Sequence, residues 1–170
     1  MRFSTRARYA LRMMLKVARM SSAGVPVSMS VIARETDISK SYLEQLAIPL
    51  RSAGLLRGRA GRSGGYMLSK PPAEIKVREI VEAVIGPIDV VECVGDPSQC
   101  RRSHECQTRL VWALITNRVR SMLEDYSLAD LTDPAFMDVL RQQVGTVLVV
   151  PQPKAPRTCG PVRVPSRKRS

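Results

Sequence analysis

The sequence lacks the features that would identify a membrane protein or an enzyme. No run of about eighteen apolar residues occurs in the 170-residue chain, so we expect no transmembrane helix and no membrane partner. There are no paired carboxylates, no nucleophile constellation and no phosphate-binding loop, which argues against catalysis. Only four cysteines are present and no export signal is evident, so the expected location is a reducing cytoplasm.

Acidic residues are scarce at both ends of the chain. Residues 1–70 contain thirteen basic residues (Lys and Arg) but only three acidic ones (Asp and Glu). Residues 145–170 contain six basic residues and no acidic residue. Residues 71–144 contain eight against twelve, so the middle is slightly acidic. A module with such one-sided basic charge favours a polyanionic partner such as nucleic acid.

The first predicted helix runs from about Thr5 to Met20 and has two distinct faces. The apolar stripe, spaced for packing on a core, consists of Leu11, Met14, Leu15 and Ala18. The basic ridge on another face consists of Arg8, Arg12, Lys16 and Arg19. No anion lies within this ridge, and a bound polyanion would relieve the repulsion among its cations.

Two short helices with a tight turn at Asp37 and Ile38 then predict a helix-turn-helix. The first begins at Ser28 or Ser30, and the second begins at Ser39 with Ser41 and Glu44 spaced as a capping box. Pro49 predicts that this second helix bends or stops near Ile48. The candidate DNA-binding side chains near its N-terminus are Ser39, Lys40, Ser41, Tyr42, Glu44 and Gln45.

A β-hairpin follows, with strands predicted at residues 55–57 and 66–68. The Gly-rich connection places Arg57, Arg59 and Arg62 at or near the tip. A hairpin directly behind a helix-turn-helix is the wing of a winged helix. Arginines on a glycine-rich tip are able to enter a DNA minor groove and sense its width.

The stretch from Cys93 to Cys106 holds three of the four cysteines, including Cys100, and the only histidine, His104. Residues 95–98, Gly-Asp-Pro-Ser, predict a loop. Soft ligands this close together suit a thiophilic metal or an iron-sulfur cluster. The alternatives are a disulfide pair and thiols packed as small apolar groups.

Helices are predicted on both sides of this stretch. Before it, a linking helix that Gly86 and Pro87 terminate has as its buried face Ile75, Val77, Ile80, Val81, Val84 and Ile85. After it, a long helix carries an apolar seam formed by Val111, Ile115, Val119, Met122 and Tyr126. The seam favours pairing with a second copy in a homodimer, with intramolecular packing as the alternative.

Taken together, residues 1–131 resemble the iron-sulfur winged-helix regulators typified by IscR and NsrR. The resemblance is carried by the opening run MRFSTRARYAL, by ISKSYLEQL at residues 38–46, by Gly64-Gly65-Tyr66 and by the three cysteines. It implies a homodimeric transcription factor, usually a repressor, that binds a pseudo-palindromic double-stranded DNA operator. It also implies that a 2Fe-2S or 4Fe-4S cluster sets the DNA affinity. Within the opening run, we take Arg2 and Arg8 as further DNA contacts.

This chain departs from the family pattern at the fourth ligand. IscR-like members carry a histidine where this chain has Arg109, and NsrR-like members carry an acid where it has Arg8. His104 is the favoured local candidate, and the other candidates are Cys159, Glu92 and Glu105. The first gap between the cysteines has six residues and the second five, where the family commonly has five in both. In the wing, Ala60 precedes the first glycine, so Arg59 or Arg62 takes the place of the usual arginine.

The sequence therefore predicts a mainly α protein, a winged helix-turn-helix with a two-stranded wing and a long C-terminal dimerisation helix. Its expected parts are a DNA-binding domain (1–70), a linking, cysteine and dimerisation region (71–144) and a disordered basic tail (145–170). The expected function is transcriptional regulation by a cluster that senses redox state, nitric oxide or iron supply. The alternatives are a cluster-free thiol/disulfide regulator with the same fold and an electron carrier, for which the basic winged helix would have no use.

Overall fold

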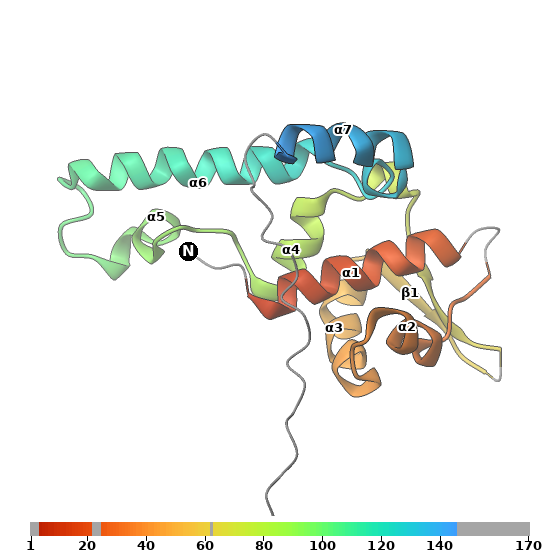
Figure 1. Ribbon diagram of the computed structural model, residues 1–170. Helices are drawn as coiled ribbons and strands as arrows, with labels where there is room; N and C mark the ends of the chain where they lie inside the picture. The colour runs from red at the N-terminus through yellow and green to blue at the C-terminus, as the bar shows by residue number, and fades with distance from the viewer. Residues whose placement is uncertain (1–3, 22–24, 62, 146–170) are drawn as a thin grey trace, which may run out of the picture.

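The computed structural model describes residues 4–21, 25–61 and 63–145, and this part of the chain is mainly helical, as expected. Its helices and strands are α1 (Thr5–Met20), α2 (Met29–Thr36), α3 (Lys40–Ser52), β1 (Leu56–Arg59), β2 (Gly65–Leu68), α4 (Val77–Ile85), α5 (Glu92–Gly95), α6 (Gln107–Asp125) and α7 (Pro134–Gly145). Helices α1 to α3 and the hairpin lie at one end, and α6 extends away from them (Figure 1). Arg2, Arg62, Cys159 and most of the predicted tail lie outside the described residues.

Helix α1 has the predicted bounds, and its first turn is capped by the Ser4 hydroxyl, which accepts the Ala7 N–H. Its buried residues are Ala7, Ala10, Met13, Met14 and Val17. Leu11, Leu15 and Ala18 are only half-buried beside them. The buried face is thus rotated relative to the predicted stripe, because α1 packs between α4 on one side and α2 and α3 on the other.

The helix-turn-helix forms as predicted. Ser28 caps α2, and Asp37 turns the chain with a left-handed backbone at φ 55°. Ser39 caps α3 by accepting the Tyr42 N–H. The capping box expected from Ser41 and Glu44 does not form, because Ser39 is the N-cap and Ser41 lies inside the first turn of α3. The Glu44 carboxylate instead lies 3.8 Å from Lys40 Nζ.

Helix α3 does not stop near Ile48, so the predicted end there is wrong, while the predicted bend stays a prediction; the helix continues through Pro49 to Ser52. Proline removes one N–H donor from the last turn, at a cost that burial of apolar side chains offsets. Leu46 and Leu50 on either side of it are almost fully buried. The Pro49 carbonyl then accepts the Ala53 N–H, which closes the helix end.

Strands β1 and β2 form the antiparallel wing, with Arg59 opposite Gly65. Two glycines are required there by close backbone approaches. A Cβ at Gly64 would collide with the Arg59 carbonyl oxygen, and one at Gly65 would collide with the Val27 carbonyl. Val27 also exchanges two backbone hydrogen bonds with Tyr66, so the segment before α2 fixes the base of the wing.

One hydrophobic core joins α1, α2, α3, β1 and α4. The predicted buried residues of α4 are buried except Ile85, which is 38% exposed at the helix end. Gly86 ends α4 with φ 82°, a conformation that favours glycine. The Val77 N–H donates to the Tyr126 carbonyl, which joins the start of α4 to the end of α6.

Candidate DNA interface and cysteine segment

The N-terminal turns of α3 present the predicted DNA-binding side chains in two different ways. The exposed side chains are those of Ser39, Lys40, Ser41, Glu44 and Gln45. Tyr42 is half-buried, and its ring packs edge-on against Tyr9 of α1, with the ring centroids 5.9 Å apart and an interplanar angle of 88°. Tyr42 therefore also anchors α3 to α1.

The basic ridge of α1 is not a row of four free cations. Lys16 Nζ lies 2.8 Å from a carboxylate oxygen of Glu35 on α2, and this pairing lowers the Glu35 pKa. Arg12 donates to the Thr36 carbonyl oxygen at 3.4 Å, while Arg8 is exposed and its guanidinium lies 6.0 Å from the centre of the Tyr9 ring. Half of the ridge thus ties α1 to α2, a role that only a contact between helices reveals.

The wing exposes Arg57 and Arg59 on β1, as expected. Arg62 and Arg2 belong to the undescribed residues. The predicted DNA contacts on α1, α3 and the wing thus belong to elements that share one core.

The cysteine segment is more structured than the predicted loop. Cys93 lies in the short helix α5, Cys100 follows a 3-10 turn at Pro97–Gln99, and Cys106 caps α6. All three thiols are free and half-buried. His104, on the turn between Cys100 and Cys106, is exposed.

The cysteine thiols and the histidine imidazole are the kinds of ligand that a thiophilic cofactor binds. The structure does not bring them together at one point. In the described ranges, no group of three or more His, Cys, Asp or Glu side chains is arranged to hold a metal ion. The Cys106 pKa lies below its ordinary value, mainly because the Thr108 hydroxyl hydrogen-bonds its sulfur at 3.1 Å, and further because the backbone N–H of Arg109 lies close by. A lowered pKa favours the thiolate, which is the metal-binding form of cysteine.

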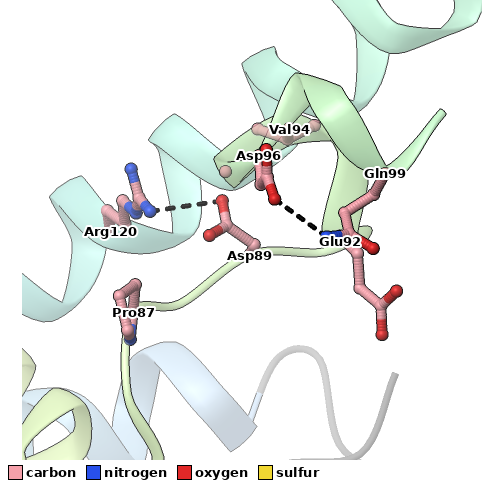
Figure 2. A pocket seen from close by; sticks show the side chains of 8 residues that line it. Pro87, Asp89, Glu92, Val94, Asp96, Gln99 and Arg120 are labelled. Atoms are coloured by element: carbon pink, nitrogen blue, oxygen red, sulfur yellow. Dashed lines mark hydrogen bonds and ion pairs between the residues drawn. The ribbon is translucent and has the colours of Figure 1, made fainter. Parts of the chain in front are cut away.

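A strap, residues 87–93, leads from α4 into the cysteine segment and is fastened to α6. Arg120 of α6 donates to the Ile88 carbonyl oxygen at 2.9 Å and lies 3.2 Å from the Asp89 carboxylate (Figure 2). The Ile88 N–H in turn donates to Glu82 of α4 at 3.3 Å. Arg120 of α6 and Glu82 of α4 thus join the strap to both flanking helices.

Two further side chains of α6 continue this fastening. The Val90 N–H donates to the fully buried Thr116 hydroxyl oxygen at 3.2 Å. Arg109 donates to the Cys93 carbonyl oxygen at 2.8 Å. Arg109, Thr116 and Arg120 lie seven and four residues apart, so they share one face of α6. The sequence reading missed this role, because the only local signal was their common helical spacing.

An open hollow of about 940 Å³ lies beside the strap and α5. Asp89, Glu92 and Asp96 line it together with Arg120 (Figure 2). The Asp96 pKa is lowered by hydrogen bonds, first from the Gln99 side-chain amide and then from Ser98. Of the predicted weaker ligands, Glu92 thus faces this hollow, while Glu105 is exposed on the turn before Cys106.

The predicted seam of α6 divides into two parts. Val119 and Tyr126 pack against the core of the same chain. The other seam residues, Val111, Ile115 and Met122, are exposed and form an open apolar face together with Leu110 and Leu114. Helix α6 thus combines packing on its own chain with an open apolar surface. None of the helices within residues 4–21, 25–61 and 63–145 is long and apolar enough to cross a membrane.

Comparison with known proteins identifies the family. The Rrf2 family, described as iron-dependent transcriptional regulators, matches residues 3–134. IscR of Photorhabdus laumondii is 35% identical over 159 residues, which cover 93% of this chain and 96% of the relative. The structure of CymR, the global cysteine regulator of B. subtilis, is similar with a TM-score of 0.64 and 34% identity, covering 78% of this chain and 96% of that one. The T. potens IscR structure has a TM-score of 0.60 and 26% identity, covering 89% of this chain and 94% of that one.

These relatives confirm the winged-helix fold and the resemblance to IscR-like regulators. They are transcriptional regulators and not enzymes, in agreement with the absence of a catalytic constellation. The chain therefore belongs to the Rrf2 family of DNA-binding transcriptional regulators.

Proposed function

We propose that this protein is a homodimeric regulator, a repressor in its DNA-bound form, whose affinity for DNA is controlled by an iron-sulfur cluster. Its ligands are Cys93, Cys100 and Cys106, with His104 as the fourth. The observation that carries the proposal is the presence of three free, half-buried thiols within fourteen residues, on a segment fastened to the helices around it. The fourth ligand is chosen because His104 is exposed on the turn between two of the cysteines and is free to approach them.

When bound, an iron-sulfur cluster supplies a centre that responds to oxidants, nitric oxide and iron supply. The chain itself supplies thiolates, of which Cys106 has the lowered pKa. Arg109 adds a positive charge between the first and third cysteines, since its side chain donates to the Cys93 carbonyl oxygen and its backbone N–H donates to the Cys106 carbonyl oxygen at 3.1 Å. A cation at this point favours a negatively charged set of thiolates.

The strap gives the cysteine segment a connection to the DNA-binding helices. A displacement of Cys93 would move Arg109, because the Arg109 side chain donates to the Cys93 carbonyl oxygen. A displacement of Ile88 would move both Arg120 and Glu82, because they hydrogen-bond the Ile88 carbonyl oxygen and N–H. Helix α4, which carries Glu82, packs against α1 and α3. We infer that the state of the cysteines shifts the population of DNA-binding conformations through this contiguous set of contacts.

DNA is contacted in this proposal by the N-terminal turns of α3 in a major groove and by the tip of the wing in the adjacent minor groove. The second copy pairs through the open apolar face of α6. Two-fold symmetry then places two α3 helices about one DNA turn, or about 34 Å, apart. The operator is accordingly pseudo-palindromic.

Anaerobic purification followed by an ultraviolet-visible spectrum and assays of iron, sulfide and zinc tests the cofactor. Wild-type protein is expected to be brown, with comparable iron and sulfide. Cys100→Ser should remove the colour and the response of DNA binding to oxidation, whereas the matched control Cys159→Ser should change neither. His104→Ala should make the colour less stable in air. Retention of full colour by Cys100→Ser would overturn the ligand assignment.

A second candidate function is a cluster-free thiol switch, and two observations favour it. The chain is 34% identical to a global cysteine regulator, and the lowered Cys106 pKa makes that thiol a better nucleophile. Here Cys100 pairs with Cys106 or Cys93: two thiols lose two protons and two electrons to a peroxide, which is reduced to water. This protein would be colourless even after anaerobic reconstitution, and dithiothreitol would reverse its change in DNA affinity.

A further inference from the structure

The last turn of α3 and strand β1 border two adjoining hollows that share Arg51 and Gly58. The larger, of about 560 Å³, also touches Ile48 and Arg57, and the smaller, of about 280 Å³, also touches Arg59. A continuous groove therefore runs between the end of α3 and the wing.

The groove has a strong positive charge. Arg51, Arg57 and Arg59 are all exposed, and in the part of the chain that the structure describes none of them belongs to an ion pair. By contrast, Arg78 and Arg120 on α4 and α6 both form ion pairs with Glu82. Three unpaired guanidinium groups around one groove repel one another, and an anion between them relieves this repulsion.

The dimensions of α3 determine which part of DNA this groove meets. Thirteen helical residues span about 20 Å, which exceeds the roughly 12 Å width of the major groove. Arg51 lies eleven residues beyond Lys40, or about 16 Å along the axis. If the Lys40 end meets base edges, the Arg51 end lies beside the sugar-phosphate backbone.

We propose that Arg51, with Arg57 and Arg59, forms a seat for a backbone phosphate of duplex DNA between α3 and the wing. The proposal rests on the proposed DNA interface and adds to it a residue that the helix-turn-helix pattern does not single out. The guanidinium of Arg51 presents two parallel N–H donors to phosphate oxygens. This contact fixes the position of the protein on DNA and carries no sequence information of its own.

The test uses the full-length protein and a fluorescein-labelled 30-base-pair duplex of mixed sequence, with binding followed by fluorescence anisotropy between 50 and 200 mM KCl. Each phosphate contact contributes about 0.9 to the slope of log affinity against log salt. The dimer carries Arg51 twice, so Arg51→Ala should reduce the slope by about 1.8. Its loss of affinity over this fourfold range should then be about 12-fold smaller than that of wild type. Arg51→Lys, which keeps the charge, should retain the slope.

Arg141→Ala removes the same charge from α7 and serves as the matched control, and circular dichroism verifies that each variant is folded. An unchanged slope in Arg51→Ala, with a flattened slope in Arg59→Ala, would overturn the seat and leave the DNA interface intact. An equal effect of Arg141→Ala would also overturn it, because net charge alone would then explain the result. Failure of wild-type protein to bind the duplex would overturn the interface and the seat together.

Discussion

Replacement of Leu114 by alanine should weaken dimerisation strongly without unfolding the protomer. Leu114 is 67% exposed in the single chain and lies at the centre of the open apolar face of α6. Its side chain contributes little to the core of its own protomer, so the stability of the isolated fold should not change. Its burial against a second copy is what the substitution removes.

The expected magnitude follows from the exposed fraction. Leucine to alanine removes three carbon atoms at about 0.8 kcal/mol each when fully buried, so covering two thirds of the side chain is worth about 1.6 kcal/mol. A two-fold interface contains the substitution twice, which gives about 3 kcal/mol per dimer. The dimer Kd should accordingly rise more than about 100-fold.

Sedimentation equilibrium over a range of protein concentrations measures this change in Kd. Ile48→Ala is the matched control, because Ile48 is 64% exposed but lies on α3, away from α6. The control should leave the dimer Kd unchanged. A change of less than threefold in Leu114→Ala would refute the reasoning and show that another surface joins the two copies.

Two further predictions concern stability at fixed protein concentration. Thr116→Val keeps the shape of a fully buried side chain but leaves the Val90 N–H without its acceptor, so the free energy of unfolding in urea should fall by about 1 to 3 kcal/mol. The exposed substitution Thr5→Val should stay within about 0.5 kcal/mol, and an equally small loss in Thr116→Val would contradict the role of the strap. The Asp130 pKa is lowered by hydrogen bonds from the Ser127 hydroxyl and N–H. The Asp130 carboxylate therefore stabilises the fold at pH values above its unfolded pKa of about 3.9. This stabilisation is lost as the pH falls through the lower pKa of the folded state. Acidification from pH 6 to pH 3 should therefore lower the urea midpoint more in wild type than in Asp130→Asn; equal sensitivity of the two would show that Asp130 does not contribute to the acid response.

The fold was predictable from the sequence because its signals are local. Ser28 and Ser39 cap their own helices, Gly86 ends α4, and the glycines before Tyr66 mark the returning strand of the wing. Each of these residues acts on backbone groups within a few positions or on a neighbouring strand. Pro49 does not end the helix, because burial of the apolar side chains beside it outweighs the missing donor.

The candidate site was predictable only in its chemistry. The residue types and spacing of Cys93, Cys100 and Cys106 suffice to predict thiol ligands, and the basic ends of the chain suffice to predict a polyanion. The proposed roles of these cysteines and of the DNA contacts stay predictions until the experiments above are made. The ion pair between Lys16 and Glu35 shows why charge patterns alone mislead, since its partners come from two helices.

The sequence by itself determined the helix-turn-helix, the linking and long helices, the wing and the kinds of side chain available for sensing and DNA binding, because propensity, capping and periodicity act over short distances. Only the tertiary structure decided which partners those side chains take. Arg109, Thr116 and Arg120 bind backbone groups that lie 16, 26 and 32 residues away, and Arg51 meets the wing only because α3 and β1 pack together. Such contacts depend on how the helices assemble around the shared core, and no local pattern specifies that arrangement.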